Sequence, residues 1–263
     1  MNPDLRSAWF SSHYEEVTGH STRKIALEML RMSDRPITRS SFILDNACGP
    51  GILASVVPCL SSNKRRYICV TSVIKEQHPY AEIVATDESP YMIQSLEARK
   101  FANGWTDVET SITDVHSLYG FKDNTFSHVF TSLALSPVAE QANIAIKEVL
   151  RVLKPGGVAF FSTWGDYRVQ AAFYDASLIV RPTEEPNVSF SLLTEWTQEA
   201  WLTTQLEIGG FEKDSIIVNY CTTSWAAPTA NKLIDNMMIY KREQQPAFFA
   251  GYSKEEANKF NYW

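Results

Sequence analysis

The chain of 263 residues has few cysteines, and their spacing matches no metal-binding or redox motif. It holds four cysteines, at positions 48, 59, 69 and 221, and none of them forms a C-x-x-C pair or lies at zinc-ligand spacing from a histidine. Scattered cysteines in a chain of this length are typical of reduced thiols. We therefore expect a cytoplasmic protein with no bound metal.

The sequence also lacks an excess of positive charge and a long apolar segment. Its formal net charge is −6 at pH 7, which gives no electrostatic footprint for nucleic acid. No run reaches the roughly 18 apolar residues that cross a bilayer, and the first residues lack the apolar stretch of a signal peptide. We expect no nucleic-acid partner and no membrane partner, while a hydrophobic content of 44% suits a large globular core.

From residue 41 onward, short apolar runs alternate with longer amphipathic ones. Helical spacing and stop signals predict helices over 21–32, 52–60, 90–103, 138–153 and 191–208. Apolar runs predict strands over 41–45, 82–86, 108–112, 126–133, 158–163 and 215–220. This alternation indicates an α/β fold, a Rossmann-like and mostly parallel sheet with helices on both faces. Residues 61–80 are expected to form a loop with one helical turn, and polar residues 165–190 an insertion after the fifth strand.

The turn after the first strand is the feature that carries chemistry. Residues 42–54 read F-I-L-D-N-A-C-G-P-G-I-L-A, so a strand leads into glycines and then into a predicted helix. Gly49 and Gly51 lack a Cβ that would block the close approach of a ligand. The helix N-terminus behind them offers free N–H groups to a carboxylate or a phosphate. An ordinary glycine turn would show the same short pattern.

A nicotinamide-dependent oxidoreductase is one alternative, because Gly49 to Ala54 fits the G-x-G-x-x-G/A dinucleotide pattern. That pattern expects an acid about 20 residues after the glycines. Here the acid that ends the second strand is Asp87, and 87 − 51 = 36. Asp45, at the end of the first strand, would repel a pyrophosphate and attract a cationic ligand. The two acids therefore favour a cationic ligand over a dinucleotide.

The segment D-N-A-C-G-P-G at 45–51 resembles motif I of the class I S-adenosylmethionine-dependent methyltransferases. Later landmarks of that family follow in order at 83–87, 113–115, 126–132 and 148–157, so the resemblance covers about residues 41–165. More narrowly, Ser162-Thr163-Trp164 and a pattern of Trp, Leu and Gly between 196 and 211 are similar to fungal natural-product methyltransferases, the gliotoxin thiomethyltransferase group in particular.

The resemblance implies one methyltransferase domain over 1–263, with a helical lid (1–40), a cofactor-binding core (41–164) and an acceptor-side insertion and C-terminal part (165–263). Its cofactor would be S-adenosyl-L-methionine. Asp45 would hold the amino group, Asp87 the ribose hydroxyls, and Asp114 and Val115 the adenine. The implied cofactor contacts are Tyr14, Asp45, Ala47, Gly49, Gly51, Asp87, Glu88, Met92, Thr113, Asp114, Val115 and Thr131.

The acceptor implied by the resemblance is a small molecule with a thiol, an amine or a hydroxyl, met in fungal secondary metabolism. Trp9, Trp164 and Phe173 would line its pocket, and no catalytic base is assigned. In this family the sheet usually ends with a seventh, antiparallel strand, which the sequence after Tyr220 does not show. An open sheet edge would invite a homodimer. It also leaves a second alternative, a methyltransferase-like protein that binds partners without transferring a methyl group.

Overall fold

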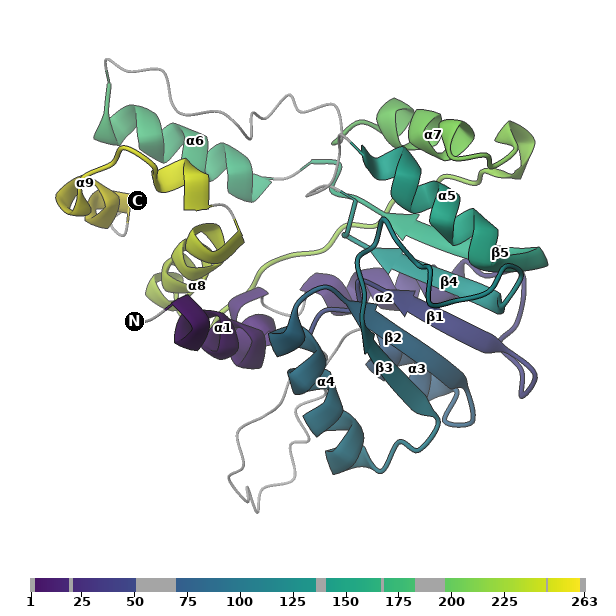
Figure 1. The fold of residues 1–263 in the computed structure, drawn as a ribbon. Coiled ribbons are helices and arrows are strands. Elements are labelled where there is room, and N and C mark those ends of the chain that lie inside the picture. Colours follow the sequence, from purple (N-terminus) through teal and green to yellow (C-terminus); the bar gives the residue numbers. More distant parts are fainter. Residues whose placement is uncertain are drawn as a thin grey trace.

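A five-stranded sheet forms the centre of the computed structural model (Figure 1). The strands lie in the order β3-β2-β1-β4-β5, and every neighbouring pair is parallel. The strand order reverses between β1 and β4, where open α/β sheets bind ligands at the carboxyl ends of their strands. The strands are β1 (Phe42–Asn46), β2 (Glu82–Asp87), β3 (Val108–Ile112), β4 (Phe126–Ser132) and β5 (Leu153–Ser162).

The structure describes most of the chain, including all five of these strands. The described residues are 3–18, 21–50, 70–135, 141–166, 168–182, 197–244 and 246–260. The helix predicted over 52–60 lies outside them, as does Gly51. Among the described residues, no helix combines the length and the apolar character needed to cross a bilayer.

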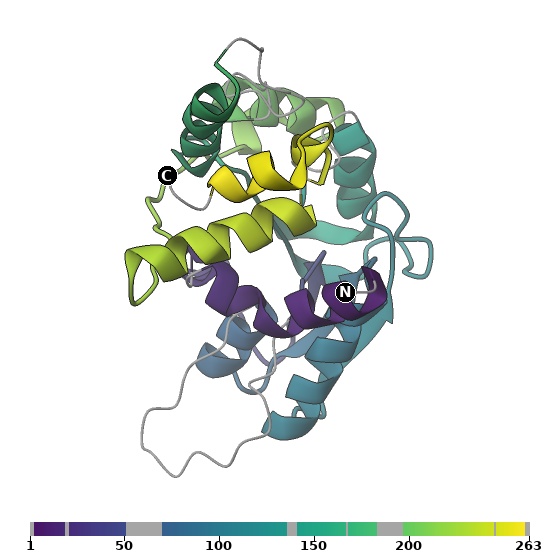
Figure 2. The ribbon, with the colours of Figure 1, turned by 90° about the vertical axis from the view of Figure 1, so that its left-hand side faces the viewer.

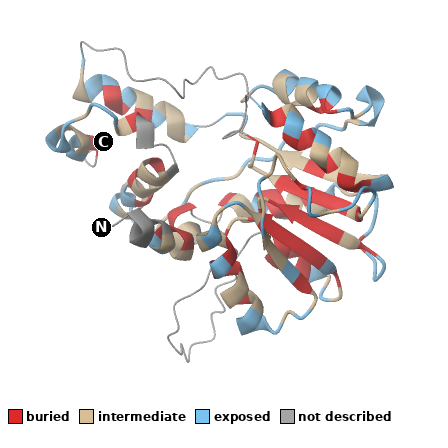
Figure 3. Cartoon of the chain, viewed as in Figure 1, coloured by how far each residue is buried: buried red, intermediate tan, exposed pale blue. Residues whose placement is uncertain are grey.

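Side-chain alternation along the strands divides the sheet into two buried faces. One face packs against α2 (Ser21–Arg31) and α3 (Val70–Gln77), and the other against α5 (Ala142–Val152). Figure 3 shows the resulting block of buried residues in the sheet. The first face carries Ile43, Ile83, Phe130 and Phe160, and the second carries Leu44, Val84 and Val129. Helices on both faces confirm the predicted fold class.

The parallel register brings the carboxyl ends of β1, β2 and β4 level with one another. Asn46, the last residue of β1, pairs in register with Thr86 of β2 and Thr131 of β4. Asp87 follows Thr86 directly, and α4 (Pro90–Asn103) begins just after it with Ser89 as its N-cap. The Asp87 side chain and the turn after β1 therefore meet at one edge of the sheet.

A separate group of helices lies beside this sheet and is called the helical lobe below. It contains α1 (Pro3–Thr18), α6 (Arg168–Val180), α8 (Ala230–Gln244), the 3₁₀ turn η4 (Pro246–Phe249) and α9 (Lys254–Lys259). Figures 1 and 2 both show α1 beside α8, although they come from opposite ends of the chain. Phe173, Met238, Phe248 and Phe260 form the apolar centre of α6, α8, η4 and α9. Part of the predicted insertion is thus the helix α6.

The strand predicted over 215–220 is not a strand in the structure. The 3₁₀ turn η3 (Lys213–Ser215) begins the segment, and an extended run without ladder pairing follows it. Ile217 is 75% exposed and Tyr220 is 79% exposed, so the apolar side chains of this run are not covered by a sheet. Further along, Thr223 Oγ1 donates to the carbonyl of Ser21 at 2.9 Å, which ties the segment to α2. Among the described residues, β5 is therefore the last strand of the sheet.

Two helices also differ from their predicted extents. Residues 70–77, expected as part of a loop, form the two-turn helix α3, because Val70, Val73 and Ile74 all reach the core. The described part of the helix predicted over 191–208 is α7 (Glu199–Ile208). β5 begins at Leu153, five residues before the predicted strand, because Leu153 already pairs with Phe126 of β4. Residues 154–157 form an irregularity in the ladder, and pairing resumes where Val158 meets His128.

Candidate functional site

The turn that follows β1 has two residues with positive φ close together. Ala47 has a φ of 56° and Gly49 has a φ of 64°, values that are rare for residues with a Cβ. The backbone N–H of Cys48 donates to the carbonyl of Thr86 at 2.8 Å, so the turn is held against the end of β2. A Cβ built on Gly49 would meet no atom of the described residues within 4 Å. Among those residues nothing crowds Gly49, so the positive φ of its backbone is the reason for a glycine at this position.

Asp87 links the two loops at this edge of the sheet. Its Oδ2 accepts from the backbone N–H of Gly49 at 2.9 Å, and its Oδ1 accepts from that of Ser89 at 3.0 Å. Burial raises the pKa of the Asp87 carboxyl, while these two N–H groups oppose the shift. The carboxylate is thus fixed in orientation beside the glycine turn, as an acceptor for a ligand diol would need to be.

Asp45 is the more deeply buried acid of the site, with 1% of its surface exposed. Its Oδ2 accepts from both the backbone N–H of Thr71, at 2.8 Å, and the Thr71 hydroxyl, at 2.6 Å. Burial raises the pKa of Asp45 to about 6, against the effect of these hydrogen bonds. A buried carboxyl of this kind gains most when a cation lies beside it.

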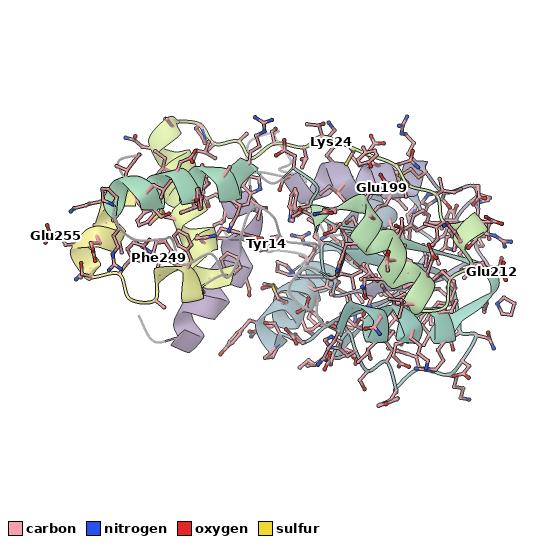
Figure 4. The ribbon with its side chains drawn as sticks, turned by 90° about the horizontal axis from the view of Figure 1, so that it is seen from above. Tyr14, Lys24, Glu199, Glu212, Phe249 and Glu255 are labelled. Carbon is pink, nitrogen blue, oxygen red and sulfur yellow. The ribbon has the colours of Figure 1, made fainter. Side chains whose placement is uncertain are left out.

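These residues border a cavity of about 350 Å³ above the carboxyl ends of the strands. This volume lies within the usual range of small-molecule sites. The structure brings to it most of the predicted cofactor contacts: Tyr14, Asp45, Ala47, Gly49, Asp87, Glu88, Met92, Thr113 and Val115. Tyr14 comes from the helical lobe, and Figure 4 shows it between that lobe, which carries Phe249 and Glu255, and the sheet region with Glu199 and Glu212. Burial raises the pKa of the Tyr14 hydroxyl, so this group stays neutral.

Two predicted cofactor contacts that the structure describes, Thr131 and Asp114, are not among the residues that line the cavity. Gly51 lies outside the described residues. Thr131 is fully buried within the sheet, where its hydroxyl accepts from Asn46 Nδ2 at 3.5 Å. Asp114 is exposed, and its Oδ1 accepts from the backbone N–H of His116 and pairs with the His116 ring, both at 2.8 Å. Asp114 therefore stabilises its own turn, whereas its neighbours Thr113 and Val115 face the cavity.

The predicted acceptor residues are dispersed in the structure. Trp9 is 37% exposed on α1 and stacks on His13 with ring centroids 4.2 Å apart. Trp164 packs against the core beneath the sheet, and Phe173 is buried in the helical lobe. Because each of the three already packs elsewhere, they do not form one pocket wall.

Other lining residues were not predicted from the sequence. Phe10 and Ser11 lie one helical turn before Tyr14, so the lid prediction could have included them through helical spacing. Glu243 comes from α8, about 200 residues along the chain from the glycine turn, and no motif marks it. The lining residues beyond the prediction are Phe10, Ser11, Thr22, Cys48, Pro50, Val70, Ser89, Ser132, Leu133, Ala134 and Glu243.

The charge on the cavity is of one sign. The ionisable lining residues include four carboxylates, Asp45, Asp87, Glu88 and Glu243, and within the described chain the lining has no Lys, Arg or His. A phosphate-bearing ligand would be repelled by such a lining, whereas a cation would be attracted. S-adenosylmethionine has a sulfonium and an ammonium group, so the donor set fits it: Asp45 for the ammonium, Asp87 for the ribose diol, and open space at Gly49.

Comparison with known proteins gives a consistent result. Residues 44–161 match the family described as a methyltransferase domain. Methyltransferase ucsB of an Acremonium species is 24% identical over 213 residues, 78% of this chain and 68% of that protein. Methyltransferase tpcH of Aspergillus fumigatus is 30% identical over 127 residues, 48% of this chain and 40% of that protein. An acetylaranotin bis-thiomethyltransferase of Aspergillus terreus is 24% identical over 136 residues, 52% of this chain and 38% of that protein.

The chain thus spans less than half the length of two of these relatives. Among solved structures, Haemonchus contortus phosphoethanolamine N-methyltransferase 2, in complex with phosphomonomethylethanolamine and S-adenosylhomocysteine, superposes with a TM-score of 0.58. The two are 15% identical, over 97% of this chain and 52% of the other. At that identity the likeness shows a shared α/β fold, which extends over the helical lobe as well as the sheet.

Proposed function

We propose that this chain, whose residues 44–161 form a class I S-adenosylmethionine-dependent methyltransferase domain, transfers a methyl group to a small-molecule acceptor. The observation that carries the proposal is the cavity in which the fixed carboxylates of Asp45 and Asp87 border the same space as the turn at Gly49. When bound, the cofactor supplies a methyl group activated by a sulfonium. The chain then has to bind, orient and exclude water, since methyl transfer needs aligned reactants more than a dedicated base.

Each part of the site has a stated task in this proposal. Asp45 holds the cationic end of the cofactor, and Asp87 accepts from the ribose diol. Met92 and Val115 contact the adenine ring with apolar surface. The helical lobe covers the cavity through Phe10 and Tyr14, which exclude water from the reacting atoms.

The proposal also covers the origin of the acceptor, the location of the protein in the cell and its oligomeric state. The acceptor belongs to secondary metabolism, which the similarity to the acetylaranotin bis-thiomethyltransferase of Aspergillus terreus supports. A cytoplasmic location is supported by cysteines that lack pairing motifs. A homodimer is supported by β5, which is unpaired on its outer side among the described residues.

Calorimetric titration with S-adenosylmethionine and S-adenosylhomocysteine tests cofactor use directly. We expect both to bind, and a parallel fluorescence titration with NADH and NADPH to show no binding. Cofactor-dependent methylation is then sought by mass spectrometry in fungal extracts supplied with S-adenosylmethionine, as a gain of about 14 Da. Absence of binding to either sulfur compound would contradict the proposal. Binding without transfer to any thiol, amine or phenol would favour a non-catalytic protein instead.

A further inference from the structure

Asp45 meets the helix α3 because of its place in the alternation along β1. It follows Ile43 by two residues, so both side chains lie on the face of the sheet that packs against α2 and α3. There the carboxylate reaches Thr71, the second residue of α3, which is fully buried. The Thr71 hydroxyl and backbone N–H both donate to the same oxygen, Asp45 Oδ2, at 2.6 Å and 2.8 Å. One oxygen of the carboxylate is therefore held twice by a single residue.

The first turn of α3 is itself fixed by the protein around it. Val70, Thr71 and Ser72 are all buried, and Ser72 Oγ accepts from Arg99 Nη1 of α4 at 2.8 Å. The backbone N–H groups of a first turn have no partner within their own helix, and Asp45 accepts from one of them. Thr71 is thus a donor with a fixed position, and its two hydrogen bonds determine the orientation of the carboxylate.

The other oxygen of the same carboxylate, Oδ1, accepts no hydrogen bond from the described part of the chain. It also retains some accessible surface, because it is not one of the fully buried, unpartnered atoms of that part. Asp45 lines the cavity, so the cavity is the space that Oδ1 borders. The two oxygens therefore have separate tasks: Oδ2 anchors the side chain, and Oδ1 is left for a ligand.

The ionisation of Asp45 depends on the same contacts. Burial raises the pKa of Asp45, the two hydrogen bonds from Thr71 lower it, and the charge of Asp87 raises it. Thr71 thus favours the charged form that a cationic ligand needs. Other charged side chains on the neighbouring elements include Arg23, Glu76, Lys75, Arg99, Glu88 and Glu243. The variants below leave all of these unchanged, so their effects cancel when a variant is compared with the wild type.

We propose that Thr71 is a positioning residue of the cofactor site, which holds Oδ2 of Asp45 and so presents Oδ1 to the cationic end of the cofactor. This inference rests on the proposed methyltransferase function and adds to its site a residue that does not line the cavity. Thr71 acts through Asp45, and its effect on binding therefore follows the charge of that carboxylate.

Thr71→Val tests the proposal, because it keeps the shape and the backbone N–H but removes the hydroxyl. Loss of one hydrogen bond to the charged form raises the pKa of Asp45 by about one unit. S-adenosylhomocysteine is titrated into the full chain by calorimetry at pH 6 and pH 8. We expect the variant to bind about fivefold more weakly than the wild type at pH 6 and within about twofold of it at pH 8. The same ratio at both pH values would overturn the proposal.

Three further variants separate this effect from a general disturbance of the core. Thr71→Ala removes the same hydroxyl with less bulk and should show the same pH dependence, whereas Thr71→Ser should restore wild-type binding at pH 6. Thr18→Val is the matched control, since this fully buried hydroxyl has no hydrogen-bond partner within the described chain. It should bind like the wild type at both pH values, and a fivefold loss in Thr18→Val at pH 6 would count against the proposal.

The Asp45→Asn background tests whether Thr71 acts through the charge of Asp45. With no carboxylate to stabilise, Thr71→Val should change the affinity at pH 6 by less than about twofold, because the two residues act as one unit. A fivefold loss that persists in this background would show that Thr71 acts on the fold and would refute its positioning role.

A measurement without ligand separates this inference from the proposed function. In protein labelled with ¹³C at the aspartate carboxyls, the Asp45 signal is assigned by its loss in Asp45→Asn and is then titrated by NMR. We expect its midpoint to be about one pH unit higher in Thr71→Val than in the wild type, and an unchanged midpoint would overturn the inference. Failure of the wild-type protein to bind S-adenosylhomocysteine would contradict the methyltransferase function, while this titration would still test the link between Thr71 and Asp45.

Discussion

Asp87 is the residue on which the geometry of the cofactor site depends most, because it contacts both loops at the edge of the sheet. Its two carboxylate oxygens accept from the backbone N–H groups of Gly49 and Ser89. Loss of the carboxylate would therefore remove a ligand contact and also release the turn whose residues Ala47 and Gly49 have positive φ. Such turns persist only when their surroundings fix them.

We expect Asp87→Ala to weaken S-adenosylhomocysteine binding by about 1.5–3 kcal/mol, the usual scale for a hydrogen bond to a charged group. Titration calorimetry measures this change. Asp214→Ala, an exposed acid in η3 that does not line the cavity, is the control and should bind like the wild type. An unchanged dissociation constant for Asp87→Ala would show that the ribose assignment is wrong.

Asp45 gives cofactor binding a dependence on pH. Burial raises the pKa of its carboxyl to about 6, so its ionised fraction rises from about 9% at pH 5 to about 91% at pH 7. If only the ionised form holds the cationic end of the ligand, the apparent affinity follows that fraction. We expect S-adenosylhomocysteine to bind about tenfold more tightly at pH 7 than at pH 5. In Asp45→Asn the affinity should be lower and nearly constant between these pH values; an equally steep dependence would contradict the role of Asp45.

The sequence was sufficient to locate Asp45, Gly49 and Asp87, because each stands at the end of a buried strand or in the turn after it. It could not locate Glu243, which reaches the cavity only through the packing of α8 on α1. It also could not show that Trp9 stacks on His13 and that Phe173 packs inside the helical lobe, since an aromatic residue packs equally well inside a lobe as beside a ligand. Local signals thus located the part of the cavity lining that comes from the strand ends, and tertiary packing determines the part that comes from α1 and α8.

At the scale of elements, the contact between α5 and α7 shows how closely helices approach on the second face of the sheet. Gly209 ends α7 directly over Ile146 of α5, which is fully buried. A Cβ on Gly209 would lie 2.8 Å from the Cβ of Ile146, and closer still to its Cγ2. The glycine therefore permits the helices to approach and is more than a stop signal for α7.

We expect Gly209→Ala to lower the free energy of unfolding by about 1–3 kcal/mol, the usual cost of overpacking a core contact. Chemical denaturation followed by circular dichroism measures it. Gly120→Ala is the matched control, because a Cβ there meets no atom of the described part of the chain within 4 Å. It should leave stability within about 0.5 kcal/mol of the wild type or raise it slightly. Equal stabilities of the two variants would contradict the packing argument.

The helix α8 contains a second informative residue, Lys241, in the centre of the helical lobe. Its Nζ donates to Gln170 Oε1 at 2.6 Å and lies 4.3 Å from the centre of the Phe248 ring. Burial lowers the pKa of Lys241 to about 7, well below its value of about 10.4 in an unfolded chain. Between these two pH values the unfolded chain binds more protons than the folded one, so this residue makes stability rise with pH.

Thermal unfolding between pH 7 and pH 9 measures this contribution by comparison with Lys241→Met. We expect the Tm of the wild type to rise relative to that of the variant by at least about 2 °C, the shift that about 1 kcal/mol produces at this chain length. Lys254→Met, an exposed lysine in α9, should follow the wild type. A difference that stays constant over this pH range would show that Lys241 remains charged in the folded protein.

The sequence predicted a helix or strand correctly where the spacing of its apolar residues matched the side chains that the folded element buries. The first four strands and α4 lie where the sequence placed them, and β5 contains most of its predicted range, because the apolar residues of each element are buried in the core. Residues 215–220 show the same alternation, yet Ile217 and Tyr220 are exposed and no described strand pairs with them. Alternation records which side chains are apolar, whereas a strand also needs a neighbour to complete its hydrogen bonds.

On the scale of the whole molecule, the cavity lies between the sheet and the helical lobe, each of which has its own apolar centre. The sheet contributes the loops after β1, β2, β3 and β4, and the helical lobe contributes α1 and α8. A ligand between them contacts both, so its binding free energy stabilises the closed arrangement as a unit. The single domain expected for 1–263 is in this sense two lobes that share one site.

We expect S-adenosylhomocysteine at 100 times its Kd to stabilise the protein by about 2.7 kcal/mol, which corresponds to a rise in Tm of roughly 5–10 °C at this chain length. Differential scanning calorimetry should show the whole transition moving as one peak. A separate peak that does not shift with ligand would show that the helical lobe unfolds independently and has no contact with the cofactor. Asp87→Ala should reduce the shift at the same ligand concentration.

The part of the cavity lining formed by Phe10, Ser11, Tyr14 and Glu243 comes from two segments, 3–18 and 230–244. These segments flank the continuous stretch 44–161, which carries the loops at the strand ends. Substitutions in the two flanking helices can therefore reshape one side of the cavity and leave those loops unchanged. Exchange of both helices between related chains would therefore replace this side of the cavity as a unit. One side of the cavity can thus change in sequence independently of the side that the strand ends form.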